Sequence, residues 1–235
     1  MMGDMSDTVP NLRDLHGIAI DDGVVAPGRL LRSAAPAVGD AAPAGVPWPP
    51  TAVIDLRSAS EIEPEHPLSD HAAIHRVPLL GALRPGAARA SDLTGLYRVV
   101  VESAGPLLVD VVRAVSTSPG PALVHCAAGK DRTGISVALS LLLAGAAVDD
   151  VVADYLETAR HRDAIDARLT ATAGHDHRQT LPASFFETKA EAVLSVVDLW
   201  DAHDGGVQGW FEAAGGTPDD VARLHGHLRG DTMKA

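Results

Sequence analysis

The sequence contains few of the residues from which several kinds of protein are built. Its 235 residues include one cysteine, Cys126, and only 3% are aromatic. A single cysteine excludes an internal disulfide and is typical of a protein from a reducing compartment. Because aromatic rings are scarce, Ala, Val and Leu must fill the core, and the 46% hydrophobic content suffices for one sizeable core.

Positive charge and long apolar runs are scarce as well. The 19 Lys and Arg residues against 31 Asp and Glu residues give a net charge of −12, which argues against broad binding to nucleic acids or anionic membranes. The longest mainly apolar run, residues 135–143, is too short to span a bilayer, and the first residues lack a signal-peptide pattern. We therefore expect a cytoplasmic protein with no nucleic-acid partner and no stable membrane insertion, although signal-independent secretion stays open.

One stretch carries most of the chemical information. Residues 122–124 are a short apolar run typical of a buried strand, and residues 135–143 have the composition of a buried helix. Between them lies a loop with Cys126 at one end and Arg132 at the other. A loop that joins a strand to the start of a helix directs several N–H groups at one point, and the helix dipole adds positive charge there. The pattern predicts an anion site.

The residue types in this loop suit reaction with a phosphate ester. The N–H groups would stabilise Cys126 as a thiolate, which is a strong nucleophile at neutral pH. The planar guanidinium of Arg132 matches two oxygens of a phosphoryl group. Gly129 lets the backbone turn tightly toward a ligand, and Thr133 can donate its hydroxyl to the cysteine sulfur. The predicted substrate-binding residues are Ala127, Ala128, Gly129, Lys130 and Thr133.

Two other loop types share part of this pattern. A nucleotide P-loop would need its first glycine at Val124 and a Ser or Thr where Asp131 stands, so the spacing excludes it. A rhodanese-like sulfurtransferase also uses a loop cysteine, and it stays as a less favoured alternative. A phosphate-binding module that has lost turnover is a further alternative, against which the intact Cys126, Arg132 and Thr133 argue.

Residues 125–134, HCAAGKDRTG, resemble the signature of the cysteine-dependent protein tyrosine phosphatases, which reads His-Cys, five residues, Arg, then Ser or Thr. The wording GKDRTG is closest to a bacterial branch that has a mycobacterial member and acts on phosphotyrosine, phosphoserine/threonine and phosphoinositides. Weaker likenesses to that branch occur at residues 11–15 (NLRDL), 28–33 (GRLLRS), 53–58 (VIDLRS) and 154–156 (DYL). The resemblance therefore covers most of the chain.

The resemblance implies a phosphoric monoester hydrolase with a cysteinyl-phosphate intermediate and no metal or organic cofactor. Cys126 would be the nucleophile and Arg132 would hold the phosphoryl oxygens. For the general acid we favour Asp131, inside the loop, over Asp92, which also fits an ordinary helix start after Ser91. The implied partners are phosphotyrosine proteins and, with Lys130 as an additional cation for a second phosphate, phosphoinositides.

The apolar pattern alternates between strand and helix along the chain. We expect strands at residues 18–20 and 30–31, joined by a turn at 21–23, and further strands at 53–56, 74–79 and 122–124. Helices are expected at residues 93–115, with a break near 105–106, and at 135–143, 149–159, 185–200 and from 217 onward. This order predicts a single α/β domain over residues 1–235, with a mainly parallel central sheet flanked by helices.

Some features have two interpretations. The excess chain at about residues 160–200, together with the resemblance, predicts either a helical lid or ordinary helices packed behind the sheet. Asp55 and Arg57 have either a direct role or a structural ion pair with a residue such as Glu61. The histidine pairs have no Glu neighbour of the zinc-protease kind, so we expect solvated side chains rather than metal ligands. These pairs are His71/His75, His175/His177 and His225/His227.

Overall fold

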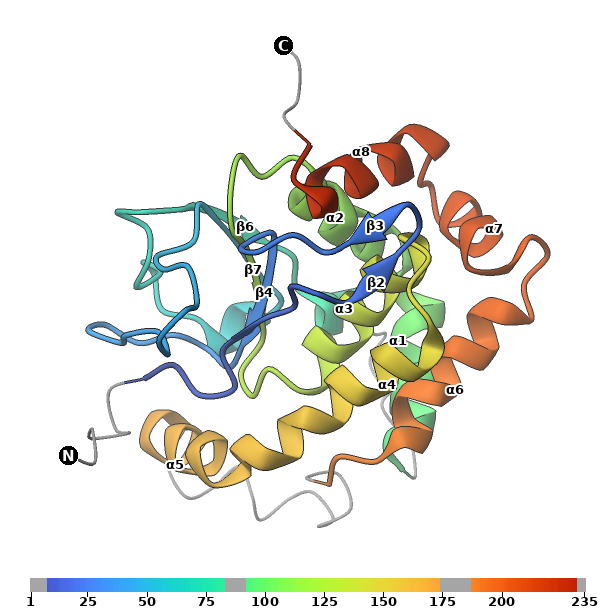
Figure 1. Cartoon of the computed structure of the whole chain (residues 1–235). Helices are drawn as coiled ribbons and strands as arrows, with labels where there is room; N and C mark the ends of the chain where they lie inside the picture. Colours follow the sequence, from blue (N-terminus) through green and yellow to red (C-terminus); the bar gives the residue numbers. More distant parts are fainter. Residues whose placement is uncertain (1–7, 83–91, 174–186, 232–235) are drawn as a thin grey trace.

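The computed structural model describes residues 8–82, 92–173 and 187–231 (Figure 1). A five-stranded sheet forms its centre, in the order β1-β4-β7-β5-β6. Strands β4, β7, β5 and β6 are parallel, and β1 pairs with β4 antiparallel. The strands are β1 Arg13–Asp14, β4 Leu30–Ser33, β5 Ala52–Asp55, β6 Ala73–Arg76 and β7 Ala122–His125. The expected α/β domain with a mainly parallel sheet is confirmed.

The turn at residues 21–23 joins other strands than we predicted. It connects β2 (Ala19–Ile20) to β3 (Gly23–Val24), and these two form a small separate antiparallel pair. Leu30 and Leu31 instead belong to β4 of the central sheet, where they pair with β7. The turn signal was interpreted correctly, but the sequence does not show that the chain leaves the hairpin before it enters the sheet.

Eight α-helices and three short 3-10 helices complete the described part of the chain. The predicted break near Gly105 separates α1 from α2, and Thr217 begins α8 with a capping box, as its sequence indicates. The helices are α1 Leu93–Ser103, α2 Gly105–Ser116, α3 Asp131–Leu143, α4 Val148–Glu157, α5 Arg162–Ala173, α6 Ala190–Asp201, α7 Gly206–Ala213 and α8 Pro218–Arg229; the 3-10 helices are η2 Ala59–Glu61, η3 Leu79–Ala82 and η4 Thr158–His161.

The three central strands, β4, β5 and β7, are buried on both faces because their apolar residues alternate between two cores. Leu30, Ile54 and Val124 point into the larger core, which the helices fill. Their neighbours Leu31 and Val53 point into a smaller core on the other face. In Figure 1 the helices gather on one side of the sheet and the blue and teal loops cover the other.

The helices at residues 160–200 have different surroundings. Val193, Val196 and Trp200 of α6 are fully buried in the main core, where α6 packs against α1, α3 and α4. Helix α5 lies at the edge of the molecule in Figure 1, and one side of it borders the pocket described below. Residues 174–186, between these helices, lie outside the described part.

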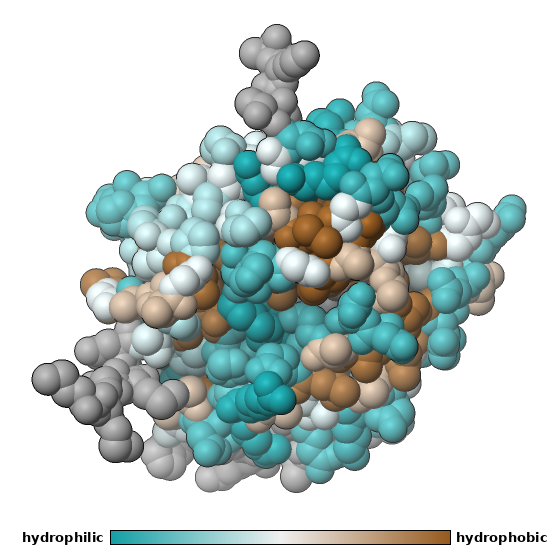
Figure 2. Space-filling model, in the orientation of Figure 1, coloured by the Kyte–Doolittle hydropathy of each residue, from teal (hydrophilic) through white to brown (hydrophobic). Residues whose placement is uncertain are grey.

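Figure 2 shows a surface that is hydrophilic over most of the visible face, with apolar side chains in separate small areas. Among the described residues, the exposed large hydrophobic side chains are Val24, Val38 and Leu156. No described helix is long and apolar enough to cross a membrane. The apolar residues of the described chain are therefore used mainly in the two cores.

The parallel strands place their carboxyl ends at one edge of the sheet. His125 at the end of β7 pairs with Ser33 of β4 on one side and with Asp55 of β5 on the other. In open α/β sheets, ligands bind in the crevice outside these ends. The loop after β7, which begins with Cys126, therefore lies at the centre of the edge where a site is expected.

Candidate active site

The anion loop runs from the end of the central strand to the first turn of a helix. Cys126 follows β7 directly, and Asp131 and Arg132 are the first residues of α3. The four N–H groups at the start of a helix have no intrahelical partner, so they are available to an anion together with the dipole. The strand, loop and helix that the sequence predicts are all confirmed.

Surrounding groups hold the loop carbonyls on its outer side. His125 Nδ1 contacts the Cys126 carbonyl at 3.2 Å, and the backbone N–H of Ala35 donates to the Ala127 carbonyl at 3.1 Å. The Gly129 carbonyl accepts from Asn11 Nδ2 at 2.9 Å and from Arg32 Nη2 at 2.7 Å. Since N–H and C=O point in opposite directions across a trans peptide, these bonds direct the following N–H groups toward the inside of the loop.

Gly129 is the one position in this loop where only glycine fits. Its φ is +67°, a left-handed conformation that side chains disfavour. A Cβ at this position would lie 2.2 Å from the carbonyl oxygen of Ser33, at the end of β4. The glycine therefore lets the loop pack directly against the neighbouring strand, as well as turn.

A carboxylate orients the arginine of the loop. Glu61, in η2, accepts from Arg132 Nη1 and Nη2 at 2.7 Å each, and the Leu56 carbonyl accepts from Nη1 at 3.3 Å. Although burial lowers the pKa of Arg132, a thiolate at Cys126 and the Glu61 carboxylate raise it above its usual value. The buried guanidinium is therefore permanently charged and fixed in one plane, as bidentate binding of a phosphoryl group requires.

Asp131 is held by two donors on one of its oxygens. The hydroxyl of Tyr97, in α1, donates to Asp131 Oδ1 at 2.8 Å, and Lys130 Nζ lies 3.1 Å from the same atom. Tyr155 of α4 contacts the Tyr97 hydroxyl at 2.9 Å. Burial and the Asp131 charge raise the pKa of Tyr97 well above its usual value, so its hydroxyl keeps the proton that it donates.

The loop residues line a pocket of about 270 Å³. Cys126, Asp131 and Arg132 form its base, with Ala127, Ala128 and Lys130 beside them. One wall is apolar and comes from α1 and α5: Leu93, Leu96, Ile165 and Leu169. The pocket thus combines an anion site at its base with a wall that suits an aromatic or aliphatic group.

Three further residues that the sequence singled out are Lys130, Thr133 and Asp92. Lys130 is buried, and its Nζ donates to the Glu187 carbonyl at 2.9 Å besides meeting Asp131. Thr133 Oγ1 is buried and makes no hydrogen bond to any residue in the described part of the chain. Asp92 is exposed and is itself the N-cap of α1, where it accepts from the Gly95 N–H at 2.8 Å.

The weaker sequence likenesses converge on this loop. Asn11 and Arg32 bind the Gly129 carbonyl, and Asp154 forms ion pairs with Arg32 and Arg13. The Tyr155 hydroxyl contacts the hydroxyl of Tyr97, which donates to Asp131. Sequence reasoning did not assign these functions, because each depends on a partner at least 58 residues away in the chain.

The ion pairs around Asp55 differ from the expectation. Asp55 binds Arg57 through both carboxylate oxygens, at 3.0 and 2.9 Å, so these two residues pair with each other. Glu61 is thereby available to Arg132 instead. The interpretation of Asp55 as part of a structural ion pair is supported, but its partner is Arg57.

The histidine pairs also differ among themselves. His71 is exposed as expected, whereas His227 is buried and its Nε2 lies 2.9 Å from the Arg29 carbonyl, so a solvated His227 was wrong. His175 and His177 lie outside the described residues. The grouping that the sequence did not suggest is His66 with His125 beside Asp55.

Comparison with known proteins places this architecture in a family. The model of a family described as "Tyrosine phosphatase family" matches residues 5–230, nearly the whole chain. The chain belongs to the tyrosine phosphatase family. The "Putative tyrosine-protein phosphatase" of Cupriavidus necator is 32% identical over 243 residues, which cover 94% of this chain and 86% of the relative.

A second relative matches over a shorter region. It is the "Triple specificity protein phosphatase PtpB" of Mycobacterium tuberculosis, 32% identical over 122 residues, which cover 47% of this chain and 44% of the relative.

Proposed function

We propose that the protein hydrolyses phosphoric monoesters through a cysteinyl-phosphate intermediate. The observation that carries the proposal is one pocket that holds Cys126, the Glu61-bound Arg132 and Asp131 on a loop whose N–H groups face inward. The thiolate of Cys126 attacks phosphorus, so that an S–P bond forms while the P–O ester bond breaks. The loop N–H groups and Arg132 bind the equatorial oxygens, on which charge spreads in the transition state.

Asp131 is our proposed general acid. It lies beside Arg132 at the pocket base, and its side chain is 32% exposed, so it can reach a leaving oxygen. It protonates that oxygen, and in the second step the carboxylate takes a proton from the water that cleaves the S–P bond and releases inorganic phosphate. Asp92 remains the alternative, but it caps a helix and is not among the residues that line the pocket.

The apolar wall favours phosphotyrosine as a substrate class. An aryl phosphate carries its ring on the ester oxygen, and Leu93, Leu96 and Ile165 line the same pocket as Cys126. We propose phosphotyrosine proteins as the main substrates, with phosphoserine/threonine proteins and phosphoinositides as further ones. Helix α5 is the described helix of residues 160–200 that lines the pocket, so we propose that any lid movement involves α5 rather than the buried α6.

Turnover of p-nitrophenyl phosphate tests the mechanism. Cys126→Ser should abolish turnover but still bind phosphate, because a neutral alcohol is a poor nucleophile here. Arg132→Lys should fail almost as badly, since a point charge does not replace the planar fork. Near-wild-type rates in either variant would refute the mechanism, and phosphate binding without any wild-type turnover would support a binding module.

The general acid is tested by the pH dependence of the rate. Asp131→Asn should remove the basic limb of the profile and slow alkyl phosphates more than aryl ones, because a better leaving group needs less protonation. Asp92→Asn is the matched variant and should leave the limb intact. The opposite pattern would transfer the role to Asp92.

A further inference from the structure

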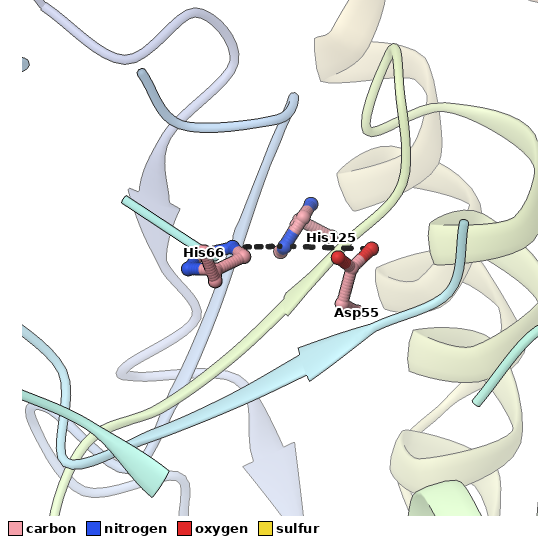
Figure 3. A group of neighbouring side chains, drawn as sticks. All are labelled: Asp55, His66 and His125. Carbon is pink, nitrogen blue, oxygen red and sulfur yellow. Dashed lines mark hydrogen bonds and ion pairs between the residues drawn. The ribbon is translucent and has the colours of Figure 1, made fainter. Parts of the chain in front are cut away.

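Three buried side chains meet directly behind the catalytic loop (Figure 3). His125 ends β7, Asp55 ends β5, and His66 comes from the segment between η2 and β6. The Nε2 atoms of the two histidines are 3.1 Å apart, and Asp55 Oδ1 lies 3.7 Å from His125 Nε2. Two histidines and a carboxylate can be a metal site or a hydrogen-bonded chain.

The backbone N–H of Leu68 distinguishes these two possibilities. It donates to His66 Nδ1 at 3.1 Å, so this nitrogen is an acceptor. A neutral imidazole carries one N–H and one acceptor nitrogen, and the proton of His66 therefore lies on Nε2, facing His125. A metal ion would require that proton to be lost, and the Arg57 guanidinium on Asp55 would repel the cation.

The hydrogen bonds continue from His66 to the catalytic cysteine. His125 Nε2 accepts from His66 Nε2, so the proton of His125 lies on Nδ1 and is donated to the Cys126 carbonyl at 3.2 Å. Burial lowers the pKa of His66, and it lowers the pKa of His125 to about 4 despite the neighbouring Asp55. Both rings are therefore neutral near pH 7, and the direction of each bond is defined.

Charged side chains near His66 and His125 also affect the pKa values of the two histidines. Asp55 raises the pKa of both histidines, while Arg57 lowers both. Arg76 of β6 lowers the pKa of His66, and Glu63 raises it. These contributions oppose one another, so burial decides the neutral state.

We propose that His66 is a positioning residue of the catalytic loop. Through His125 it fixes the carbonyl of Cys126, and with it the N–H of Ala127 at the other end of the same planar peptide. That N–H is the first donor that the loop offers to a phosphoryl oxygen. This inference rests on the proposed function, because it concerns the alignment of a donor toward the transferred group.

Turnover of p-nitrophenyl phosphate by His66 variants tests the positioning. His66→Ala should lower kcat about tenfold, because removing one oxyanion donor outright costs about 10²–10³ and misalignment costs less. His66→Gln, whose amide can donate in place of Nε2–H, should recover most of that loss. His71→Ala, in the same segment and exposed, should behave as wild type. Unchanged kcat in His66→Ala, or equal losses in His66→Ala and His66→Gln, would overturn the proposal.

A second measurement is independent of turnover. Nitrogen-15 NMR of the full chain with labelled histidines should show protons on His66 Nε2 and His125 Nδ1, and inorganic phosphate should bind more weakly to His66→Ala than to wild type. One equivalent of Zn²⁺ should leave both histidine signals in place. Reversed tautomers, unchanged phosphate binding or signals moved by zinc would each overturn the proposal. A wild-type protein without phosphatase activity would instead refute the proposed function, while these signals and phosphate binding still test the positioning.

Discussion

A variant of Glu61 offers the sharpest test of how Arg132, the proposed phosphate-binding arginine, is positioned. Its carboxylate makes two hydrogen bonds of 2.7 Å to Arg132, one to each terminal nitrogen. Glu61→Ala removes both acceptors and leaves the guanidinium able to rotate, whereas Glu61→Gln keeps one neutral acceptor. We expect activity to fall in the order wild type, Gln, Ala.

The expected size follows from this geometry. A hydrogen bond to a charged group contributes about 1.5–3 kcal/mol, but 29% of the Glu61 side chain is exposed, so water can replace part of the interaction. We therefore expect Glu61→Ala to lose about 2 kcal/mol of transition-state stabilisation. That loss corresponds to a fall of about 30-fold in kcat/KM, and Glu61→Gln should lose about fivefold.

The ionisation of Glu61 defines the pH range in which its carboxylate contributes to activity. Burial raises the pKa of Glu61, but the hydrogen bonds and charge of Arg132 outweigh it and hold that pKa below its usual value of 4.5. The carboxylate is therefore ionised throughout the neutral range, and its contribution is lost only as the pH falls through that lowered pKa. The difference between wild type and Glu61→Ala should be constant from about pH 5.5 to pH 8.

The assay is steady-state hydrolysis of p-nitrophenyl phosphate and a phosphotyrosine peptide, with urea unfolding of each variant. The matched control is Glu63→Ala, because Glu63 is nearby, 57% exposed and contacts Arg57 at 3.7 Å rather than Arg132. Glu63→Ala should retain activity. If Glu61→Ala is as active as Glu63→Ala, Glu61 does not position Arg132.

Three further predictions concern the neighbouring groups. Tyr97→Phe removes the hydroxyl that donates to Asp131, so it should lower kcat several-fold. It should also change the basic limb of the pH–rate profile, more for alkyl than for aryl phosphates. An unchanged limb would show that Tyr97 does not act on the general acid. Lys130→Ala should lose more activity on phosphoinositides than on phosphotyrosine peptides, measured side by side; equal losses would show that the lysine acts through its contact with Asp131. The pKa of His125 is about 4 in the fold against 6.5 for an ordinary histidine, so the unfolded chain gains a proton first as the pH falls. The free energy of unfolding should therefore drop by roughly 2–3 kcal/mol between pH 7 and 4.5 in urea titrations, and a flat profile would contradict a neutral buried His125.

The sequence predicted the strand, loop and helix around Cys126 because these parts are consecutive in the chain. A strand, a tight loop and a helix start form one local unit, and the positions of Cys126, Gly129 and Arg132 within it follow from spacing alone. The helix break at Gly105 and the start of α8 at Thr217 are local signals of the same kind. Local backbone preferences and hydrophobic period determine such features.

The helices after the catalytic one show where local patterns are insufficient. The sequence pattern predicts a helix at residues 185–200, where α6 lies, but only packing decides that Val193 and Trp200 of α6 are buried in the core. Helix α5 borders the pocket instead. A helical pattern identifies an apolar face without identifying what covers it.

By itself the sequence determined the alternation of strands and helices in a single α/β domain and the strand, loop and helix around Cys126, because these features depend on neighbours within a few residues. Only the tertiary structure decided which side chains serve that loop. Glu61 reaches Arg132 across 71 positions, and Arg32 reaches the Gly129 carbonyl across 97. These contacts exist because the parallel sheet brings the carboxyl ends of β4, β5 and β7 together, and strand adjacency in a sheet is a property of the whole fold rather than of any segment.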